Sequence, residues 1–120
     1  MILGLGIDLC DIARIERAIK NERFLSRAYT EGERAKIAER GSSTAAGYFA
    51  AKEAVAKALG TGFRDFMLRD IEITPDALGR PHATLYNGAL ERMRVLGGRR
   101  MNLSITHSGG FAAAVFVIEE

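Results

Sequence analysis

The chain has 120 residues, of which 48% are hydrophobic and 27% are charged, a composition typical of a globular domain rather than a disordered or fibrous chain. Its only cysteine is Cys10, so no internal disulfide can form, and we expect a reducing, cytoplasmic environment. The 17 basic and 15 acidic residues leave a formal charge of +2, too small a surplus to predict nucleic-acid binding, and no apolar run approaches the ~20 residues that span a bilayer.

The first elements predicted are a strand and a helix. Residues 1–9 are apolar apart from their glycines and Asp8, and we predict a buried strand. After Asp11, isoleucines recur at helical spacing, and aspartate is a favourable N-cap residue. A helix should therefore begin near Asp11. Residues 12–28 then carry five basic side chains against two acidic ones, so the small net charge conceals a basic patch. Its members are Arg14, Arg17, Lys20, Arg23 and Arg27.

Two more helices are predicted before the middle of the chain. Thr30 and Glu33 have the spacing of a capping box and should begin a short helix that runs to about Arg40. The GSST segment at residues 41–44 ends it. Residues 45–59, rich in alanine and followed by Gly60, give the strongest helix signal in the chain.

The second half is predicted to consist mainly of strands. We expect strands over residues 69–74, about 82–86, 101–106 and 111–118, and a helix over residues 87–96. The last two strands are joined by a tight SGG turn, so they should pair as a hairpin. The chain has no internal repeat or linker. We therefore predict one α+β domain over residues 1–120, in which a mainly antiparallel sheet packs against the long central helix.

Asp8 is the first candidate functional residue because it lies between Ile7 and Leu9 in an apolar strand. A buried carboxylate costs free energy unless it is hydrogen-bonded, paired or bound to a cation. Two interpretations stay open. Asp8 either caps the helix that follows or is a ligand.

The long helix carries a second candidate site. Phe49, Glu53 and Lys57 fall at i, i+4 and i+8 and so form one ridge with a rise of ~6 Å per step. One interpretation is a solvated Glu–Lys pair worth a few tenths of a kcal/mol. The other is a site for a phosphate-bearing substrate with Mg²⁺, which typically binds one or two carboxylates and substrate phosphate oxygens.

His107 ends a predicted strand whose alternation places it on one face with Met101, Leu103 and Ile105. Such a histidine is either structural or a phosphate or base contact at the edge of a sheet. Other sites are not supported. The GTG sequence at residues 60–62 follows a helix rather than preceding one, so it is not a phosphate-binding loop. One cysteine and two distant histidines make no zinc site.

Three sequence blocks, taken in order, resemble the holo-(acyl-carrier-protein) synthase family of 4′-phosphopantetheinyl transferases. They are GLGIDL at residues 4–9, FAAKEA at residues 49–54 with Lys57 and the GTG sequence, and SITHS at residues 104–108. Glu33 and the GRP turn at residues 79–81 also fall where family members have similar residues. The likeness extends over essentially the whole chain, and the shared order of the blocks argues against chance.

The resemblance implies the 4′-phosphopantetheinyl transferase fold and an enzyme of fatty acid biosynthesis. It would transfer phosphopantetheine from coenzyme A to a serine of apo-acyl carrier protein and release adenosine 3′,5′-bisphosphate. By matching position, Asp8 and Glu53 would hold Mg²⁺. Glu53 and Lys57 would be the catalytic residues, and the serine proton would go to Glu53 or to a metal-bound water. The residues implied in coenzyme A binding are Phe49, Lys57, Gly60, Thr106 and His107.

The resemblance also implies an acidic partner and an oligomer. The basic patch would dock the acidic carrier protein through Arg14, Arg17, Lys20, Arg23 and Arg27, with Phe24 as an apolar anchor, since charge complementarity speeds and orients encounter. The family implies a homotrimer with active sites between subunits. Tyr48, however, stands where family members often have arginine, and residues 41–44 are short for a connecting segment. The Tyr48 departure concerns one contact to a coenzyme A phosphate, and the short segment concerns the helix that joins the two halves of the chain.

Two functions of other classes fit the sequence less well than the transferase does. A non-catalytic module that binds carrier proteins would be favoured by loss of Asp8 or Glu53, and both are present. A basic nucleic-acid-binding domain would need aromatic platforms on its strands and an overall charge surplus, and neither is found. The transferase is the function that we expect.

Overall fold

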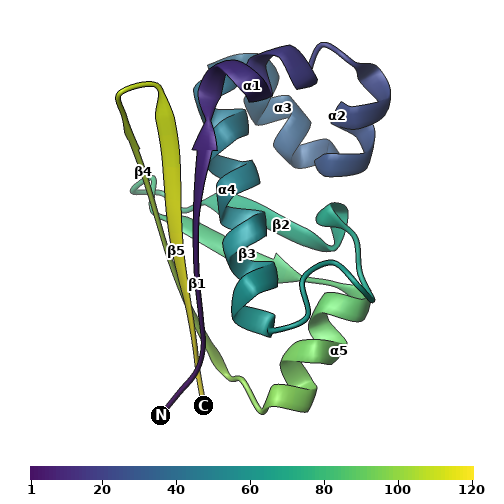
Figure 1. The fold of residues 1–120 in the computed structure, drawn as a ribbon, viewed down its shortest axis with the longest axis vertical. Helices are drawn as coiled ribbons and strands as arrows, with labels where there is room; N and C mark the ends of the chain where they lie inside the picture. The colour runs from purple at the N-terminus through teal and green to yellow at the C-terminus, as the bar shows by residue number, and fades with distance from the viewer.

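The computed structural model describes all 120 residues, and its helices and strands agree closely with the predicted α+β architecture (Figure 1). No helix combines the length and the apolar character needed to cross a membrane. The elements follow in the order β1 (Ile2–Asp11), α1 (Ile12–Ala18), α2 (Glu22–Ala28), α3 (Glu31–Arg40), α4 (Ser42–Leu59), the 3-10 turn η1 (Leu68–Asp70), β2 (Ile71–Pro75), β3 (Pro81–Leu85), α5 (Asn87–Leu96), β4 (Arg100–Ser108) and β5 (Phe111–Glu119).

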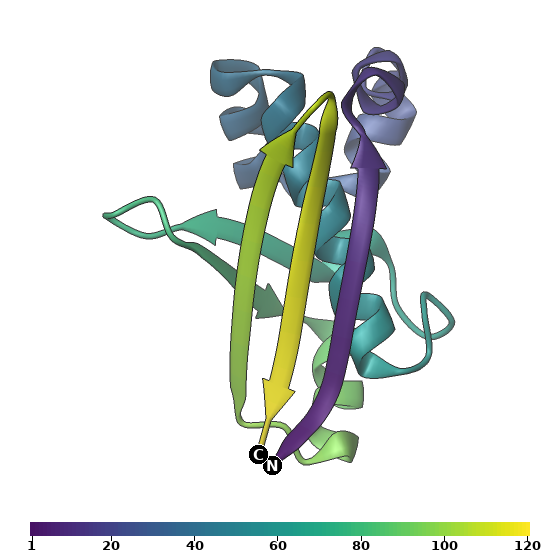
Figure 2. The ribbon, with the colours of Figure 1, turned by 60° about the vertical axis from the view of Figure 1, so that its left-hand side comes forward.

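The strands form two antiparallel sheets rather than one. A three-stranded sheet has the order β1-β5-β4, and β2 and β3 pair as a separate hairpin. The predicted β4–β5 hairpin is confirmed, with Gly109 and Gly110 both at positive φ in its turn. Helix α4 lies along one face of the three-stranded sheet, and no helix covers the other face (Figures 1 and 2). This second face is called the outer face below.

Helix α4 approaches β1 backbone to backbone. The side of β1 that faces the helix begins with Gly4 and Gly6, and a Cβ atom at either position would overlap a carbonyl oxygen of α4, that of Ala58 or Ala54 respectively. Ala54 and Ala58 are themselves buried. Small residues on both elements therefore set how close the central helix lies to the edge strand of the sheet.

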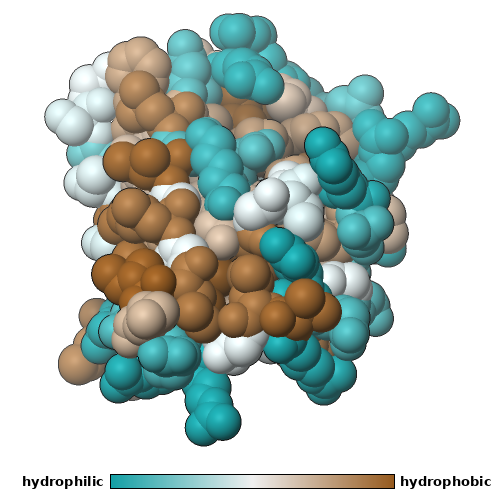
Figure 3. Space-filling model, turned by 60° about the horizontal axis from the view of Figure 1, so that its bottom comes forward, coloured by the Kyte–Doolittle hydropathy of each residue, from teal (hydrophilic) through white to brown (hydrophobic).

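The prediction of a fully buried first strand is wrong for one of its two faces. Leu5, Ile7 and Leu9 point to the outer face and are 64–66% exposed, whereas Gly6 and Cys10 on the opposite face are buried. The reason is that only one helix layer packs on the sheet. The space-filling view shows hydrophobic surface gathered on the side where Figure 1 draws the sheet (Figure 3).

The N-terminal helical region differs from prediction. Asp11 caps α1, accepting hydrogen bonds from the Ala13 and Arg14 amides, as expected. The basic patch does not lie on one helix, because the Asn21 side chain caps a second helix, α2. The patch is therefore divided between α1, the turn after it and α2.

The boundaries of the next two helices were predicted closely. The capping box of Thr30 and Glu33 begins α3, which ends at Arg40 as expected. Helix α4 starts at Ser42, three residues before the predicted position, and Gly41 precedes it without any side-chain cap. Gly60 ends α4 in the left-handed conformation at φ 84°. The observed ends of the strands in the second half differ from the predicted ends by at most two residues.

A buried ion pair joins α4 to the elements on its far side. Lys52 and Glu33 are both fully buried, with Nζ 2.7 Å from Oε1, and Lys52 also donates to the carbonyl oxygens of Leu68 and Ile71 at 2.9 and 2.6 Å. The other Glu33 oxygen accepts from the Ile73 amide. Burial raises the pKa of Glu33 and lowers that of Lys52, and their pairing opposes both shifts. All three ammonium protons thus have acceptors.

Replacing Gly6 by alanine tests the close approach of α4 and β1. The new Cβ would overlap the Ala54 carbonyl oxygen, so the helix must move, and we expect a loss of about 2–3 kcal/mol in the free energy of unfolding. Urea denaturation measures this loss. Gly32→Ala is the matched control. Gly32 lies within helix α3, where alanine favours the helix, and its new Cβ would lie at an ordinary 3.4 Å from the Glu72 side chain of β2. Equal stability of the two variants would refute the close approach.

Candidate active site

Asp8 lies on the helix-facing side of β1, where it meets the C-terminal half of α4. Its Oδ1 accepts a hydrogen bond from Lys57 Nζ at 3.1 Å, and the same ammonium donates to the Ile7 carbonyl oxygen at 2.9 Å. The Asp8 side chain is 18% exposed. Asp11, not Asp8, caps α1, so the helix-cap interpretation of Asp8 is wrong.

Glu53 lies one turn before Lys57 on α4 and has no hydrogen bond or ion pair in the structure. Its side chain is half-buried. Burial raises the pKa of Glu53, the nearby negative charge of Asp8 raises it further, and Lys57 and Arg14 oppose the increase. Glu53 and Lys57 therefore do not form the solvated pair that their spacing allowed, because Lys57 turns to Asp8 instead. We call Asp8, Glu53 and Lys57 the carboxylate–lysine cluster.

The donor set of this cluster fits one kind of metal ion. No group of three or more histidine, cysteine, aspartate or glutamate side chains could hold a metal anywhere in the chain. Two carboxylates that repel each other, one of them without a partner, would be stabilised by a divalent cation. Mg²⁺ suits such a site because it typically takes one or two carboxylates and completes its shell with water and phosphate oxygens.

Two neighbours complete the surroundings of the carboxylate–lysine cluster. Cys10 is buried on the same side of β1, and its pKa is raised by burial and by the charge of Asp8. Arg14, exposed on α1, is close enough that its positive charge favours the ionised form of Glu53. One member of the basic patch therefore borders the cluster.

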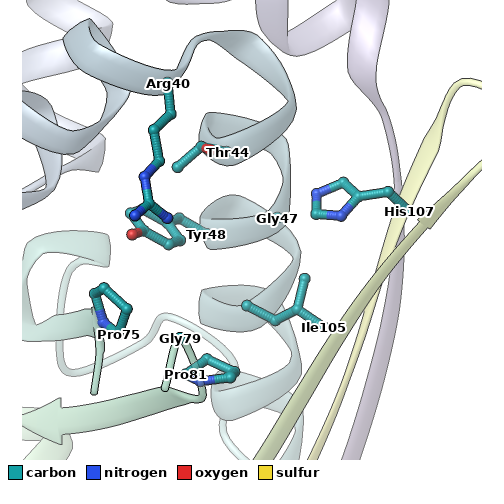
Figure 4. Close-up of a pocket in the computed structure, with 9 residues that line it drawn as sticks. All are labelled: Arg40, Thr44, Gly47, Tyr48, Pro75, Gly79, Pro81, Ile105 and His107. Carbon is teal, nitrogen blue, oxygen red and sulfur yellow. The ribbon is translucent and has the colours of Figure 1, made fainter. Parts of the chain in front are cut away.

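A separate cavity of about 190 Å³ lies at the N-terminal end of α4, beside β4. His107 borders it and holds the Ser43 carbonyl oxygen at 2.9 Å through Nε2. Glycine at residue 47 leaves room for the ring, since a Cβ there would lie at a tight 3.0 Å from Nε2. Tyr48, almost fully buried, forms the floor, and the Arg40 side chain reaches toward it (Figure 4). Burial raises the pKa of Tyr48, and Arg40 opposes that increase.

One chain does not bring His107 to the carboxylate–lysine cluster. Asp8 is on β1 and His107 on β4, the two edge strands of the sheet, with β5 between them. Two strand spacings separate these edges, roughly 10 Å. Thr106 alternates to the outer face, where it borders a shallow depression with Ile7 and Val115. The predicted site residues thus fall into separate groups within a single chain.

The remaining predicted residues lie elsewhere. Phe49 packs against Phe24 with ring centroids 6.1 Å apart, and Phe24 also meets Tyr29 edge to face at 6.2 Å. Both phenylalanines are partly buried against the core, so the surface that Phe24 can offer a partner is reduced. Gly60 is exposed at the end of α4.

Sequence reasoning missed Lys52 as the residue that anchors α4. A signal was present, because its neighbours at helical spacing are Tyr48, Val55 and Ala56, which places a lysine in the middle of an apolar face. A lysine there must find buried acceptors. No signal of local spacing could have identified Glu33, 19 residues earlier, as its partner.

Comparisons with known proteins agree on one family. The model of the 4′-phosphopantetheinyl transferase superfamily matches residues 4–114. A holo-(acyl-carrier-protein) synthase of Solidesulfovibrio magneticus is 48% identical over 122 residues, covering 99% of each chain, and one of Clostridium tetani is 47% identical over 123 residues, covering 99% of this chain and 97% of the relative. The crystal structure of the Helicobacter pylori synthase in complex with coenzyme A superposes with a TM-score of 0.85 at 36% identity, covering 96% of this chain and 99% of that one.

The raised pKa of Glu53 predicts a cost to folding. Because the folded pKa lies above the ordinary value of 4.5, the native state binds more protons than the unfolded state just above pH 4.5, and stability falls as pH rises through the folded pKa. Glu53→Gln removes that cost. In the presence of a metal chelator, we expect this variant to be more stable than the unmodified chain at neutral pH and to lose its advantage below pH 4.5.

Urea denaturation at the two pH values measures the effect. Glu91→Gln, at an exposed position on α5, is the control and should change stability little at either pH. A Glu53→Gln variant that is no more stable than the unmodified chain at neutral pH would contradict the conclusion that the ionised Glu53 carboxylate destabilises the folded state.

Proposed function

The chain belongs to the 4′-phosphopantetheinyl transferase superfamily, and from this premise we propose that it transfers 4′-phosphopantetheine from coenzyme A to a serine of apo-acyl carrier protein. Adenosine 3′,5′-bisphosphate is the second product. The observation that carries the proposal is the carboxylate–lysine cluster, in which Lys57 pairs with Asp8 at 3.1 Å beside the negative charge of Glu53. We assign its carboxylates to a divalent cation and its lysine to phosphate. We place the reaction in the cytoplasm, in support of fatty acid biosynthesis.

The reaction is a phosphoryl transfer, so its catalysis depends mainly on positioning and electrostatics. The serine oxygen attacks the phosphorus that bears the pantetheine arm, and the bond from that phosphorus to the bridging oxygen breaks. The bridging oxygen leaves with the nucleotide. Negative charge increases on the diphosphate as this happens, and Lys57 is placed to neutralise it because its ammonium lies on the exposed edge of the cluster.

Asp8 and Glu53 are the residues that would hold Mg²⁺. Their fit rests on the repulsion between the two carboxylates and on the lack of any partner for Glu53. When bound, the ion would supply positive charge to the diphosphate oxygens. Asp8 is fixed by the rigid strand β1 and Glu53 by the central helix, so the two carboxylates are held in place before substrate binds.

We assign the serine proton to Glu53. Glu53 is half-buried on α4 and has no hydrogen bond or ion pair in the structure, so its carboxylate is available to accept a proton from the serine. One Glu53 oxygen can face the cation while the other faces the serine.

We propose that the protein works as a homotrimer whose neighbouring chains share each site. His107 lies about two strand spacings from Asp8 in one chain. A neighbour that presents its β4 edge could add His107 and Thr106 to the nucleotide end of coenzyme A, with Phe49 and Gly60 as further contacts. The apolar outer face supports association, because isolated domains rarely expose so many large apolar side chains together.

The carrier protein is proposed to dock on the basic patch. Its five cations are exposed on α1, the following turn and α2, and Arg14 borders the cluster where the serine must arrive. An acidic partner would be steered by these charges. Phe24 is partly buried beside the patch, and we propose that its remaining exposed surface is the apolar anchor for the partner.

The direct test uses purified protein, coenzyme A, Mg²⁺ and an apo-acyl carrier protein. We expect the mass of the carrier to increase by one phosphopantetheine, and Glu53→Gln to lower turnover by about 100-fold or more, because metal binding and proton transfer are both impaired. Glu91→Gln should retain activity. Failure to modify the carrier, with a known synthase active in parallel, would reject the proposed function.

Mixing two inactive variants tests the shared site. Asp8→Asn and His107→Ala are each expected to be inactive alone. After their chains are unfolded and refolded together, about one quarter of sites should combine an intact Asp8 with an intact neighbouring His107. Activity near that fraction of the unmodified protein supports sharing between chains. No recovery, with trimers demonstrated by ultracentrifugation, would place both residues in the site of one chain.

A further inference from the structure

Lys57 makes two contacts within the protein, in addition to the contact with phosphate that we propose for it. Its Nζ donates to Asp8 Oδ1 at 3.1 Å and to the Ile7 carbonyl oxygen at 2.9 Å. Strand β1 is an edge strand of its sheet, so the lysine provides a donor where no neighbouring strand does. The ammonium is therefore tied to the strand that carries the metal-binding carboxylate.

The two partners differ in burial. The Asp8 side chain is 18% exposed, and that of Lys57 is 54% exposed. A mostly buried carboxylate needs a positive neighbour, because desolvation penalises its charge. The exposed lysine can leave by side-chain rotation, since its side chain is not part of the hydrophobic core. Asp8 thus has a counter-ion that can be exchanged.

The same carboxylate oxygen cannot serve two cations equally well. A divalent ion at Asp8 would stand beside the Lys57 ammonium, and like charges at such short distance repel strongly in a partly desolvated site. The diphosphate of coenzyme A offers Lys57 an alternative anion. Arg14 is the other cation near the cluster, and it donates no hydrogen bond to Asp8 or Glu53.

We propose that Lys57 is a built-in counter-ion of Asp8 that competes with the divalent cation and is released to the diphosphate when coenzyme A binds. This inference rests on the proposed function, because it assigns the cation to Asp8 and the diphosphate to Lys57. It has two consequences. The protein alone binds the cation weakly, and coenzyme A and the cation strengthen each other's binding, since each favours the position of Lys57 that the other needs.

The test measures Mn²⁺ binding, by electron paramagnetic resonance of the free ion, in the absence of coenzyme A and carrier. Lys57→Met should tighten Mn²⁺ binding by about 10-fold, because the competing ammonium is gone. Arg14→Met is the matched control, since it removes a nearby positive charge that is not bonded to Asp8. We expect it to tighten binding by no more than about 2-fold.

A second comparison separates direct competition from a general effect of charge. In an Asp8→Asn background, Lys57→Met should change Mn²⁺ binding no more than Arg14→Met does. In the unmodified protein, coenzyme A should tighten Mn²⁺ binding by a larger factor than in Lys57→Met. Thermal denaturation of each variant verifies that the exposed position tolerates the change.

Equal effects of Lys57→Met and Arg14→Met would overturn the counter-ion role while leaving the proposed transferase intact. Mn²⁺ binding that Asp8→Asn does not weaken would overturn both the counter-ion role and the placement of the metal. Loss of carrier modification in the unmodified protein is a separate readout, and it alone rejects the transferase. Selective tightening in Lys57→Met supports the inference.

Discussion

The close contact between α4 and β1 is the constraint on which the rest of the structure depends. Gly4 and Gly6 remove the side chains that would hold the helix away, and Ala54 and Ala58 offer only methyl groups in return. With α4 this close to the sheet, the helix-facing residues of the central strand β5 are buried, namely Ala112, Ala114, Phe116 and Ile118. The contact also places Asp8, two residues beyond Gly6 on the same side of the strand, beside the last turns of the helix. The same contact between α4 and β1 therefore forms part of the core and positions the candidate site.

The rotation of α4 about its own axis is determined by the buried pair on its other side. Lys52 is held by Glu33 and by two carbonyl oxygens, so it faces the β2–β3 hairpin and α3. The next residue, Glu53, lies about 100° further round the helix and so faces the β1 edge. The adjacent residues Lys52 and Glu53 therefore lie in opposite environments. The first is neutralised within the core, and the second is left without a partner at the edge where a cation is proposed to bind.

The same arrangement separates the predicted site residues into two groups within one chain. A single helix layer can cover only one face of a three-stranded sheet, so Leu5, Ile7 and Leu9 stay exposed on the outer face. His107 lies on the edge strand β4, whereas Asp8, the strand-borne member of the carboxylate–lysine cluster, lies on the opposite edge strand, β1. The unused apolar face and the divided site are both consistent with association of several copies, which is how a chain of 120 residues could hold coenzyme A and a carrier protein together.

The sequence by itself determined the elements and the family. Capping residues, glycines and apolar periodicity are local signals, and they predicted α3, α5 and the β4–β5 hairpin nearly to the residue, while Asn21 was overlooked as the cap of α2. Three motif blocks indicated the superfamily. Only the tertiary structure decided that Lys57 pairs with Asp8, 49 positions away, and not with Glu53 on its own helix. The physical reason is that partners distant in sequence are chosen by packing, and here the choice depends on how closely two glycines let a helix approach a strand.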